Sequence, residues 1–304
     1  MLHTIICNGS TLCYENTPGV YTGEYYLYCC RLLVEAMKEC SNKINIIIGP
    51  YHYTFDNNNP VVRLDIQPEH TLVKSGGRSV SEPIMGSTLT KDDKETYLVR
   101  IDKFDYYKSL DGVIEYSIPN IINMHTCSNE EIAQFAKKCR YIAPLIYETD
   151  RLENNERSGV FTLFSLGSSF RREVFHKSTG IENISGVFCP AKLAELYYNK
   201  AIMVNIHQTD HHHTFEELRV LPALSQGVVV VSEDSPLKEH IPYSDSIVWS
   251  SLEDMNEVVL DVERNYQSYR AKLFTEKLSE TLDRLRQNNA VNISELIWQN
   301  KTSN

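Results

Sequence analysis

The chain has 304 residues, which predicts about two domains at roughly 100–200 residues each. Hydrophobic residues make up 42% and charged residues 23%, an ordinary globular composition that excludes a disordered or fibrous protein. Lys and Arg number 30 against 40 Asp and Glu, a formal charge of -10 with no basic stripe, so nucleic acid is disfavoured as a partner. No apolar run approaches the roughly 18 residues that cross a bilayer, so we expect no transmembrane segment.

The N-terminus and the cysteines predict a cytoplasmic protein. Residues 1–7 lack the basic and long apolar regions of a signal peptide. The 8 cysteines are scattered and form no C-x-x-C pair. This usage is typical of reduced, mostly buried thiols in the cytosol.

Short apolar strands alternate with helical patterns along residues 1–150. The expected strands are 4–7, 44–48, 61–66, 97–101, 112–116 and 141–145, and the expected helices are 24–40 and 123–140. The run at 44–48 is continuous and apolar, as is typical of a strand covered on both faces. Residues 75–94 are rich in Gly, Ser, Thr and Asp, and they predict a loop or insertion. The alternation predicts a largely parallel α/β sheet.

A second α/β set follows a polar connection. Residues 148–159 are charged and end on Gly, so they predict the junction between domains 1–150 and 151–304. Beyond it we expect strands at 160–164, 186–188, 201–205, 227–231 and 246–249, helices from 169, at 191–199 and at 214–225, and an amphipathic tail at 251–286. Two such halves predict a cleft between the carboxyl edges of their sheets, a usual place for a ligand.

The most informative stretch is 204–234, VNIHQTDHHHTFEELRVLPALSQGVVVVSED. It predicts a strand, a polar loop, a helix, a Gly and an apolar strand. Thr214 suits the helix N-cap, and Glu216 and Glu217 suit the positive N-terminal end of the helix. Capping explains these two acids without a ligand, so a binding role depends on the wider pattern.

That wider pattern resembles the nucleotide-sugar-binding half of GT-B glycosyltransferases, over about residues 158–250. In those enzymes a helix begins with a carboxylate, and its small-residue end runs into Gly and an apolar strand, as here. The resemblance implies that Glu216, with Glu217 as runner-up, binds the two ribose hydroxyls of the nucleotide. Pro222 stands where many retaining members carry the second Glu of an E-x7-E pair, so the resemblance favours an inverting enzyme.

Residues 164–173, FSLGSSFRRE, predict a strand end, a Gly/Ser turn and a helix that begins with two arginines. Backbone N–H groups and a helix N-terminus bind diphosphates, and Arg adds a bidentate charge. GT-B donor sites are similar in layout, although a capped helix with surface arginines explains the same residues. The expected donor site comprises Gly167, Ser168, Ser169, Arg171, Arg172, His207, Thr214, Glu216 and Glu217.

Within the family, the chain resembles small glycosyltransferases of large algal viruses, of the chlorovirus capsid-glycan type, and of bacterial polysaccharide clusters. The resemblance implies the GT-B fold, in which two Rossmann-like domains face each other across a cleft and a C-terminal helix braces the first domain. It implies a hexosyl- or pentosyltransferase with a UDP-sugar donor and a glycan acceptor. The transferred group that it suggests is xylose or another small neutral sugar. A GDP-sugar (fucosyl-type) donor stays the alternative, and for a viral protein the location is the host cytoplasm.

Metal and cofactor chemistry is not expected. His207 and His211 are four residues apart and His211–His213 are consecutive, but this segment reads as a loop without Cys or a helical H-E-x-x-H pattern. The resemblance also implies no catalytic metal, because Arg and helix dipoles neutralise the leaving diphosphate. The nucleotide sugar is a co-substrate, and no other cofactor is implied.

An inverting enzyme needs a general base that takes the proton of the acceptor hydroxyl. We expect it in the first domain, at a strand end, and Asp65, Glu69 and His70 come first because three polar groups crowd one strand exit. Glu24 and residues 115–120 stay open as alternatives.

Other enzyme classes lack their motifs. The first strand is not followed by G-x-G-x-x-G, and neither a G-x-x-x-x-G-K-[ST] loop nor a G-x-S-x-G elbow occurs. The remaining alternative is a catalytically silent module that binds a nucleotide sugar or glycan, which an assay of donor hydrolysis or transfer would distinguish.

Overall fold

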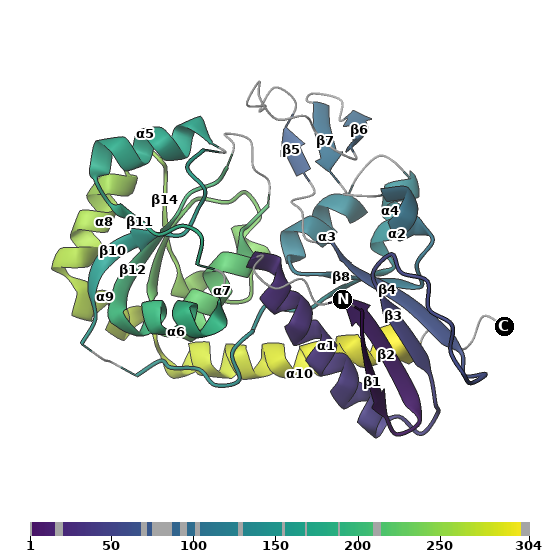
Figure 1. Cartoon of the computed structure of the whole chain (residues 1–304). Helices are drawn as coiled ribbons and strands as arrows, with labels where there is room; N and C mark the ends of the chain where they lie inside the picture. The colour runs from purple at the N-terminus through teal and green to yellow at the C-terminus, as the bar shows by residue number, and fades with distance from the viewer. Residues whose placement is uncertain are drawn as a thin grey trace.

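The computed structural model of the chain describes residues 2–15, 21–67, 72–74, 87–91, 96–100, 104–126, 130–153, 156–167, 169–187, 189–208 and 214–298, with backbone only at 21–22, 72–74, 87–91 and 96–100. Within them the strands form a six-stranded, a five-stranded and a three-stranded sheet. The two larger sheets are separate and lie side by side with their own helices (Figure 1). This arrangement confirms the expected α/β fold class of two Rossmann-like units.

The first unit is built on the six-stranded sheet, in the order β1-β2-β3-β4-β8-β9. Its strands are β1 (Leu2–Cys7), β2 (Ser10–Glu15), β3 (Asn45–Ile48), β4 (Val61–Gln67), β8 (Gly112–Glu115) and β9 (Cys139–Tyr141). All neighbours are parallel except β1 and β2, which form a hairpin absent from the sequence prediction. Asn8 and Gly9 turn this hairpin at φ 49° and 75°, the left-handed pair that an Asn-Gly turn requires.

Helices cover both faces of the first sheet, which is why every residue of β3 is buried. On one face α1 (Tyr21–Glu39) and α10 (Glu276–Trp298) pack against residues such as Leu12, Ile46 and Leu64. On the other face, α2 (Phe104–Lys108), α3 (Ile118–His125) and α4 (Glu130–Ala136) surround Val113.

The second unit is built on the five-stranded sheet, which is parallel throughout in the order β11-β10-β12-β13-β14. Its strands are β10 (Ser158–Thr162), β11 (Glu182–Asn183), β12 (Lys200–Asn205), β13 (Val229–Glu233) and β14 (Val248–Ser250). Its helices are α5 (Phe170–Thr179), α6 (Pro190–Asn199), α7 (Glu217–Ser225), α8 (Met255–Arg264) and α9 (Tyr266–Leu273), with 3-10 turns η1 (Lys238–His240) and η2 (Ser244–Ser246). Val230 packs in the cluster with α6 and α7, whereas Val229 and Val231 pack with α5, α8 and α9.

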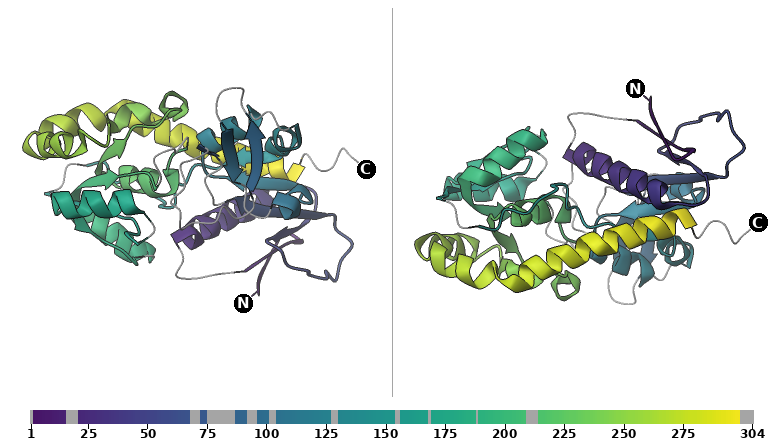
Figure 2. Two further views of the ribbon diagram at one scale, coloured as in Figure 1. Left: turned by 90° about the horizontal axis from the view of Figure 1, so that it is seen from above. Right: turned by 90° about the horizontal axis from the view of Figure 1, so that it is seen from below.

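Helix α10 runs from the second unit back along the first (Figure 2). Asn289 is fully buried; its oxygen accepts from Ala143 N at 2.8 Å, and its Nδ2 donates to Ala143 O and Tyr28 Oη at 2.8 and 2.9 Å. About one turn earlier on α10, Arg286 makes a bidentate pair with Asp150, at 2.7 and 2.6 Å. The helix therefore holds the segment that leaves the first sheet.

The carboxyl ends of the two sheets meet. β8 leads directly into α3, and the backbone N–H of Ile118 donates to Glu217 Oε1 at 3.1 Å. Glu217 begins α7, which follows β12 of the other sheet. The binding edges of two parallel sheets thus face a common region.

Three predicted elements of the first unit differ in the structure, and the strand expected at 141–145 is shifted, since β9 is Cys139–Tyr141. The strand expected at 97–101 belongs instead to a separate antiparallel sheet of β5 (Leu72–Lys74), β6 (Ser87–Lys91) and β7 (Thr96–Arg100). The loop expected at 75–94 contains β6, and its remaining residues lie outside those described. The helix expected at 123–140 is wrong, because α3 and α4 take its place and Cys139–Tyr141 extends to pair with β8.

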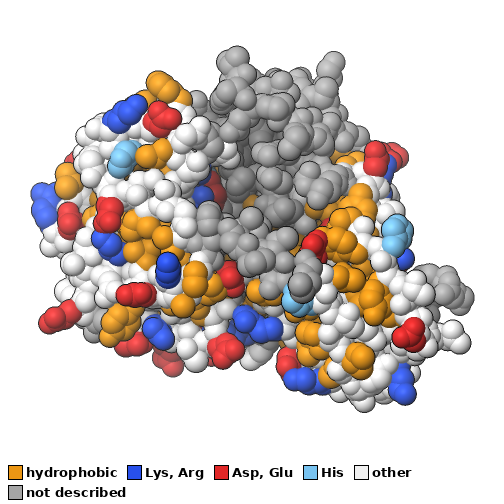
Figure 3. All heavy atoms as spheres, viewed as in Figure 1, with side chains coloured by type: hydrophobic (Ala, Val, Ile, Leu, Met, Phe, Trp, Pro, Cys, Tyr) orange, Lys and Arg blue, Asp and Glu red, His pale blue; other side chains and the backbone are white. Residues whose placement is uncertain are grey.

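In the second unit, the strand expected at 186–188 is wrong. β11 ends at Asn183, and Gly186 has φ 73°, a left-handed conformation that an extended strand does not contain. The strand and helix expected at 201–205 and 191–199 are confirmed within one residue. In the described part of the chain, every helix is too short or too polar to span a bilayer. On the face shown in Figure 3, the described basic and acidic side chains are interspersed.

Candidate functional site

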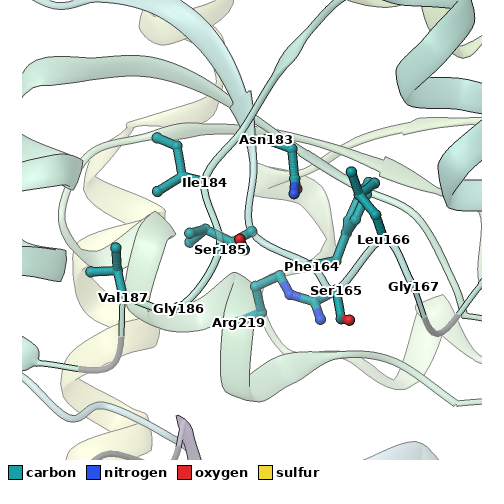
Figure 4. A pocket seen from close by; sticks show the side chains of 11 residues that line it. Phe164, Ser165, Leu166, Gly167, Asn183, Ile184, Ser185, Gly186, Val187 and Arg219 are labelled. Atoms are coloured by element: carbon teal, nitrogen blue, oxygen red, sulfur yellow. The ribbon is translucent and has the colours of Figure 1, made fainter.

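A pocket of about 570 Å³ lies at the carboxyl ends of β10 and β11. It is lined by Leu163, Phe164, Ser165, Leu166, Gly167, Asn183, Ile184, Ser185, Gly186, Val187 and Arg219. The chain leaves β10, turns through Ser165–Gly167 and enters α5, and the second wall is the segment that follows β11 (Figure 4). Its volume is in the usual range for a small-molecule site, roughly 300–1,000 Å³.

The predicted Gly/Ser turn lines this pocket in part. Gly167 is a lining residue, and a Cβ built there would meet no atom within 4 Å, so its side faces open space. Ser169, where a helix was expected to begin, is the N-cap of α5; its hydroxyl accepts from Arg172 N at 3.5 Å and donates to Gln208 O at 2.7 Å. Ser168 lies outside the described residues.

Arg219 is the cation of this pocket, and the sequence prediction missed it. It lies on the first turns of α7, and its Nη1 donates to Asn205 Oδ1 at 2.8 Å. Figure 4 shows its guanidinium beside Ser165. Among the described residues no carboxylate forms an ion pair with it, so its positive charge faces a neutral amide and the pocket. The sequence contained a pattern that could have identified Arg219. It is three residues after Glu216, which places both side chains on the same face of the helix.

Glu216 stands at the centre of a buried polar network. Its Oε2 lies 2.9 Å from His207 Nδ1 and accepts from Asn205 Nδ2 at 3.0 Å, and Arg172 lies 3.6 Å from Oε1. The carboxyl is only 4% exposed and does not line the pocket. The structure therefore gives Glu216 several protein partners at the position where ribose contact was predicted.

The contact between His207 and Glu216 requires a proton. His207 Nε2 lies 3.1 Å from the Asp234 carbonyl, which can only accept, so Nε2 carries a hydrogen. The Nδ1–Oε2 contact then needs a second hydrogen, and because Asn205 and Arg172 also direct donors at Glu216, we assign this hydrogen to the imidazole. Burial lowers the pKa of His207, but the charge of Glu216 and their hydrogen bond outweigh it, so the net shift is upward. His207 thus belongs to this network rather than to the pocket lining.

The two predicted arginines lie behind the pocket and do not line it. Arg171 makes a bidentate pair with Glu233 at 2.8 and 2.6 Å. Arg172 donates from Nε and Nη2 to Ile206 O and stacks over Phe164 at 4.9 Å. Burial lowers the pKa of Arg172 to about 9, and the positive charge of Arg219 adds to this effect. Arg171 and Arg172 are therefore held by protein partners, and neither guanidinium lines the pocket.

Two further predicted residues lie elsewhere. The prediction of Thr214 as N-cap is wrong: α7 begins at Glu217 with Glu216 as its N-cap, and no side chain caps the helix. Thr214 is buried two residues earlier, and its carbonyl accepts from Ser235 Oγ at 3.2 Å. Glu217 is fully buried at the junction of the two units, where it accepts from Ile118 N, Tyr141 and Tyr243. Neither residue lines the pocket.

The candidate base Asp65 lies two residues before the end of β4 and is 8% exposed. Its Oδ1 accepts from Ile66 N at 2.8 Å. Burial, followed by the charge of Asp65, raises the pKa of the neighbouring Tyr106. Glu69 and His70 lie outside the described residues, as do His211–His213. In the part of the chain that the structure describes, His, Cys, Asp and Glu form no cluster of three that could hold a metal.

The chain is similar to known proteins only in comparisons with solved structures. The chain matches no family model and no curated protein. Among solved structures it is similar to TarM, with 12% identity, 96% of this chain and 61% of that one covered, and a TM-score of 0.47. It is also similar to accessory secretory protein 1, 2 and 3 in Streptococcus pneumoniae (9% identity, 92% and 58% covered, TM-score 0.43) and to OtsA (11% identity, 100% and 89% covered, TM-score 0.40).

The chain spans about three fifths of the length of the first two of these structures. TM-scores below 0.5 do not establish a shared function or a shared fold. The fold assignment therefore rests on the sheet topology, and the function rests on the site.

Proposed function

We propose that the chain is a GT-B glycosyltransferase that moves a sugar from a nucleotide-diphosphate donor to a glycan acceptor. The observation that carries the proposal is a pocket at the carboxyl ends of two parallel strands that contains a cation, Arg219, whose guanidinium hydrogen-bonds a neutral amide and forms no ion pair with a described carboxylate. A diphosphate supplies the anion that such a cation lacks.

The remaining walls suit the rest of a nucleotide. Leu163, Leu166 and Ile184 provide apolar surface for a flat base, and the turn at Gly167 brings backbone close to a ligand. The capped N-terminus of α5 directs its positive end toward the same turn. The buried network of Glu216, His207 and Arg172 holds the strands and helices that carry these groups.

The identity of the donor rests on the sequence resemblance. We propose UDP as the nucleotide, with GDP as the alternative, and xylose or another small neutral sugar as the transferred group. A cytoplasmic location and a relationship to algal-virus or bacterial polysaccharide enzymes stay predictions.

We propose a direct displacement without a metal. The acceptor oxygen attacks the anomeric carbon and forms the new C–O bond, the bond from that carbon to the diphosphate oxygen breaks, and the nucleoside diphosphate leaves with the electron pair. A base at the exit of β4, chosen from Asp65, Glu69 and His70, takes the hydroxyl proton. Arg219 stabilises the charge that develops on the leaving diphosphate. The anomeric configuration is inverted, because attack and departure occur on opposite faces.

The test is product NMR with a panel of UDP- and GDP-sugars and an oligosaccharide acceptor, with and without EDTA. An inverted product that EDTA does not affect supports the proposal. A retained configuration overturns the direct displacement, and loss of activity with EDTA overturns the metal-free step. Binding of donors without transfer or hydrolysis favours the silent binding module, and no binding of any nucleotide overturns the donor site.

A further inference from the structure

The pocket contains an amide whose orientation is set by a buried hydroxyl. Thr162, 1% exposed at the end of β10, donates from Oγ1 to Asn183 Oδ1 at 2.7 Å. Because the oxygen of the amide receives this hydrogen bond, the NH2 group is the end that remains for a ligand. Among the described residues, none accepts a hydrogen bond from Asn183 Nδ2.

The amide and the cation approach the pocket from opposite sides. Figure 4 shows the Asn183 side chain pointing into the pocket across from the Arg219 guanidinium. The apolar side chains of Phe164, Leu166 and Ile184 line the space between them. If the diphosphate binds at Arg219, a flat base reaches the apolar walls and presents its polar edge to Asn183.

We infer that Asn183, held in place by Thr162, selects the nucleobase by donating from Nδ2 to the carbonyl oxygen at the position where the bases differ, O4 of uracil or O6 of guanine. This inference rests on the proposed donor site. A carbonyl occurs at the relevant edge of uracil (O4) and guanine (O6), whereas cytosine and adenine carry an amino group there. Two amino groups facing each other leave both donors unpaired, which costs free energy where the bound base displaces water from the amide. The pocket therefore takes UDP or GDP and rejects CDP or ADP.

The experiment is isothermal titration of the full chain with UDP, CDP, GDP and ADP. For the native protein we expect UDP to bind about 10- to 100-fold more tightly than CDP, or GDP more tightly than ADP by the same factor. In Asn183→Asp, Thr162 still donates to one carboxylate oxygen, and the other becomes an acceptor. The ratio of UDP to CDP affinity, or of GDP to ADP, should then fall about 10- to 100-fold or invert.

Two further variants control for charge and for folding. Asn199→Asp adds the same charge on an exposed residue of α6, and it should leave the affinity ratio unchanged. Thr162→Val frees the amide to rotate, so the preference should shrink even if Asn183→Asp does not fold. An unchanged ratio in both Asn183→Asp and Thr162→Val, with tight UDP binding retained, overturns the role of Asn183 and leaves the donor site standing. If the native protein binds none of the four nucleotides, the donor site is overturned and the inference with it.

Discussion

The Glu217 carboxylate on α7 accepts a hydrogen bond from the Tyr141 hydroxyl on β9, with 2.7 Å between the oxygens, and so joins the second unit to the first. Tyr243 Oη donates to the same oxygen at 2.9 Å, and Ile118 N donates to the other at 3.1 Å. Burial raises the pKa of Glu217 to about 7, although these donors act in the opposite direction. A buried acid at the junction makes the association of the two units dependent on pH.

Stability should fall as pH rises from about 4.5 to about 7. In this range the folded chain keeps a proton on Glu217 that the unfolded chain has released, so the stabilisation present below 4.5 is lost as pH passes 7. The full effect is about 3 kcal/mol. Glu217→Gln cannot titrate, and its melting temperature should change less between pH 5 and pH 8 than that of the native protein.

The control for this prediction is Glu280→Gln, an exposed position on α10, which should show the native pH dependence. Glu115 is also buried near this junction, and burial raises its pKa. Its titration also lowers stability as pH rises, so Glu217→Gln should keep part of the pH dependence of the melting temperature. Equal slopes in the native protein and in Glu217→Gln would contradict the assignment.

Arg219→Ala should weaken binding of the nucleoside diphosphate about 10- to 150-fold, because a charge-assisted hydrogen bond is worth about 1.5–3 kcal/mol. The change also removes the donor to the fully buried Asn205 Oδ1, at a cost of about 1–3 kcal/mol, so binding is measured well below the lowered melting temperature. Arg264→Ala, which removes an exposed arginine at the end of α8, is the matched control. Native affinity in Arg219→Ala, measured by titration, would place the diphosphate elsewhere.

Glu216→Ala should destabilise the fold rather than only weaken nucleotide binding. Removing this carboxylate leaves protonated His207 and Arg172 buried without their shared anion, which typically costs about 3–5 kcal/mol. Urea unfolding measures the loss. Glu216→Gln keeps an acceptor for Asn205 and should be less destabilised; a native midpoint for Glu216→Ala would show that the network contributes little.

Asn289→Ala should loosen α10 from the first unit. The side chain makes three buried hydrogen bonds, and their removal leaves the Ala143 backbone unpaired, at a cost of about 2–4 kcal/mol. Asn288→Ala changes the exposed neighbour on the same helix and should have almost no effect. Thermal unfolding of the two variants side by side tests the brace, and equal melting temperatures would contradict it.

Asp65→Asn tests the proposed base. If Asp65 takes the acceptor proton, turnover should fall about 10²- to 10⁴-fold while the affinity for the nucleotide stays native. The amide keeps an acceptor for Ile66 N, so the fold should be retained. Asp56→Asn, in an exposed loop, is the control. Native turnover in Asp65→Asn would move the role to Glu69 or His70.

The amino-acid sequence by itself determined the strands and the class of fold. Residues 44–48 and 201–205 are mostly apolar because they are buried from both sides, and their composition predicted parallel strands covered by helices. The Asn8-Gly9 pair encodes a hairpin that the sequence prediction missed, although its backbone preference acts over only two residues. The cap of α5 at Ser169 is local in the same way, since its hydroxyl contacts the helix three residues on.

Only the tertiary structure decided which polar groups face the pocket. Arg171 on α5 pairs with Glu233, 62 residues away at the end of β13, because α5 packs on the face of the sheet that includes β13. Glu217 pairs with Tyr141, 76 residues away, because the two sheets meet at their carboxyl ends. Burying a charge is costly unless a partner lies within hydrogen-bond distance, so each side chain turns toward the partner that the packing supplies. That partner depends on strand order and on the docking of two units, neither of which is encoded in a short motif. For this reason the arginines at the predicted turn lie behind the pocket, and Arg219, from a different helix, lines it.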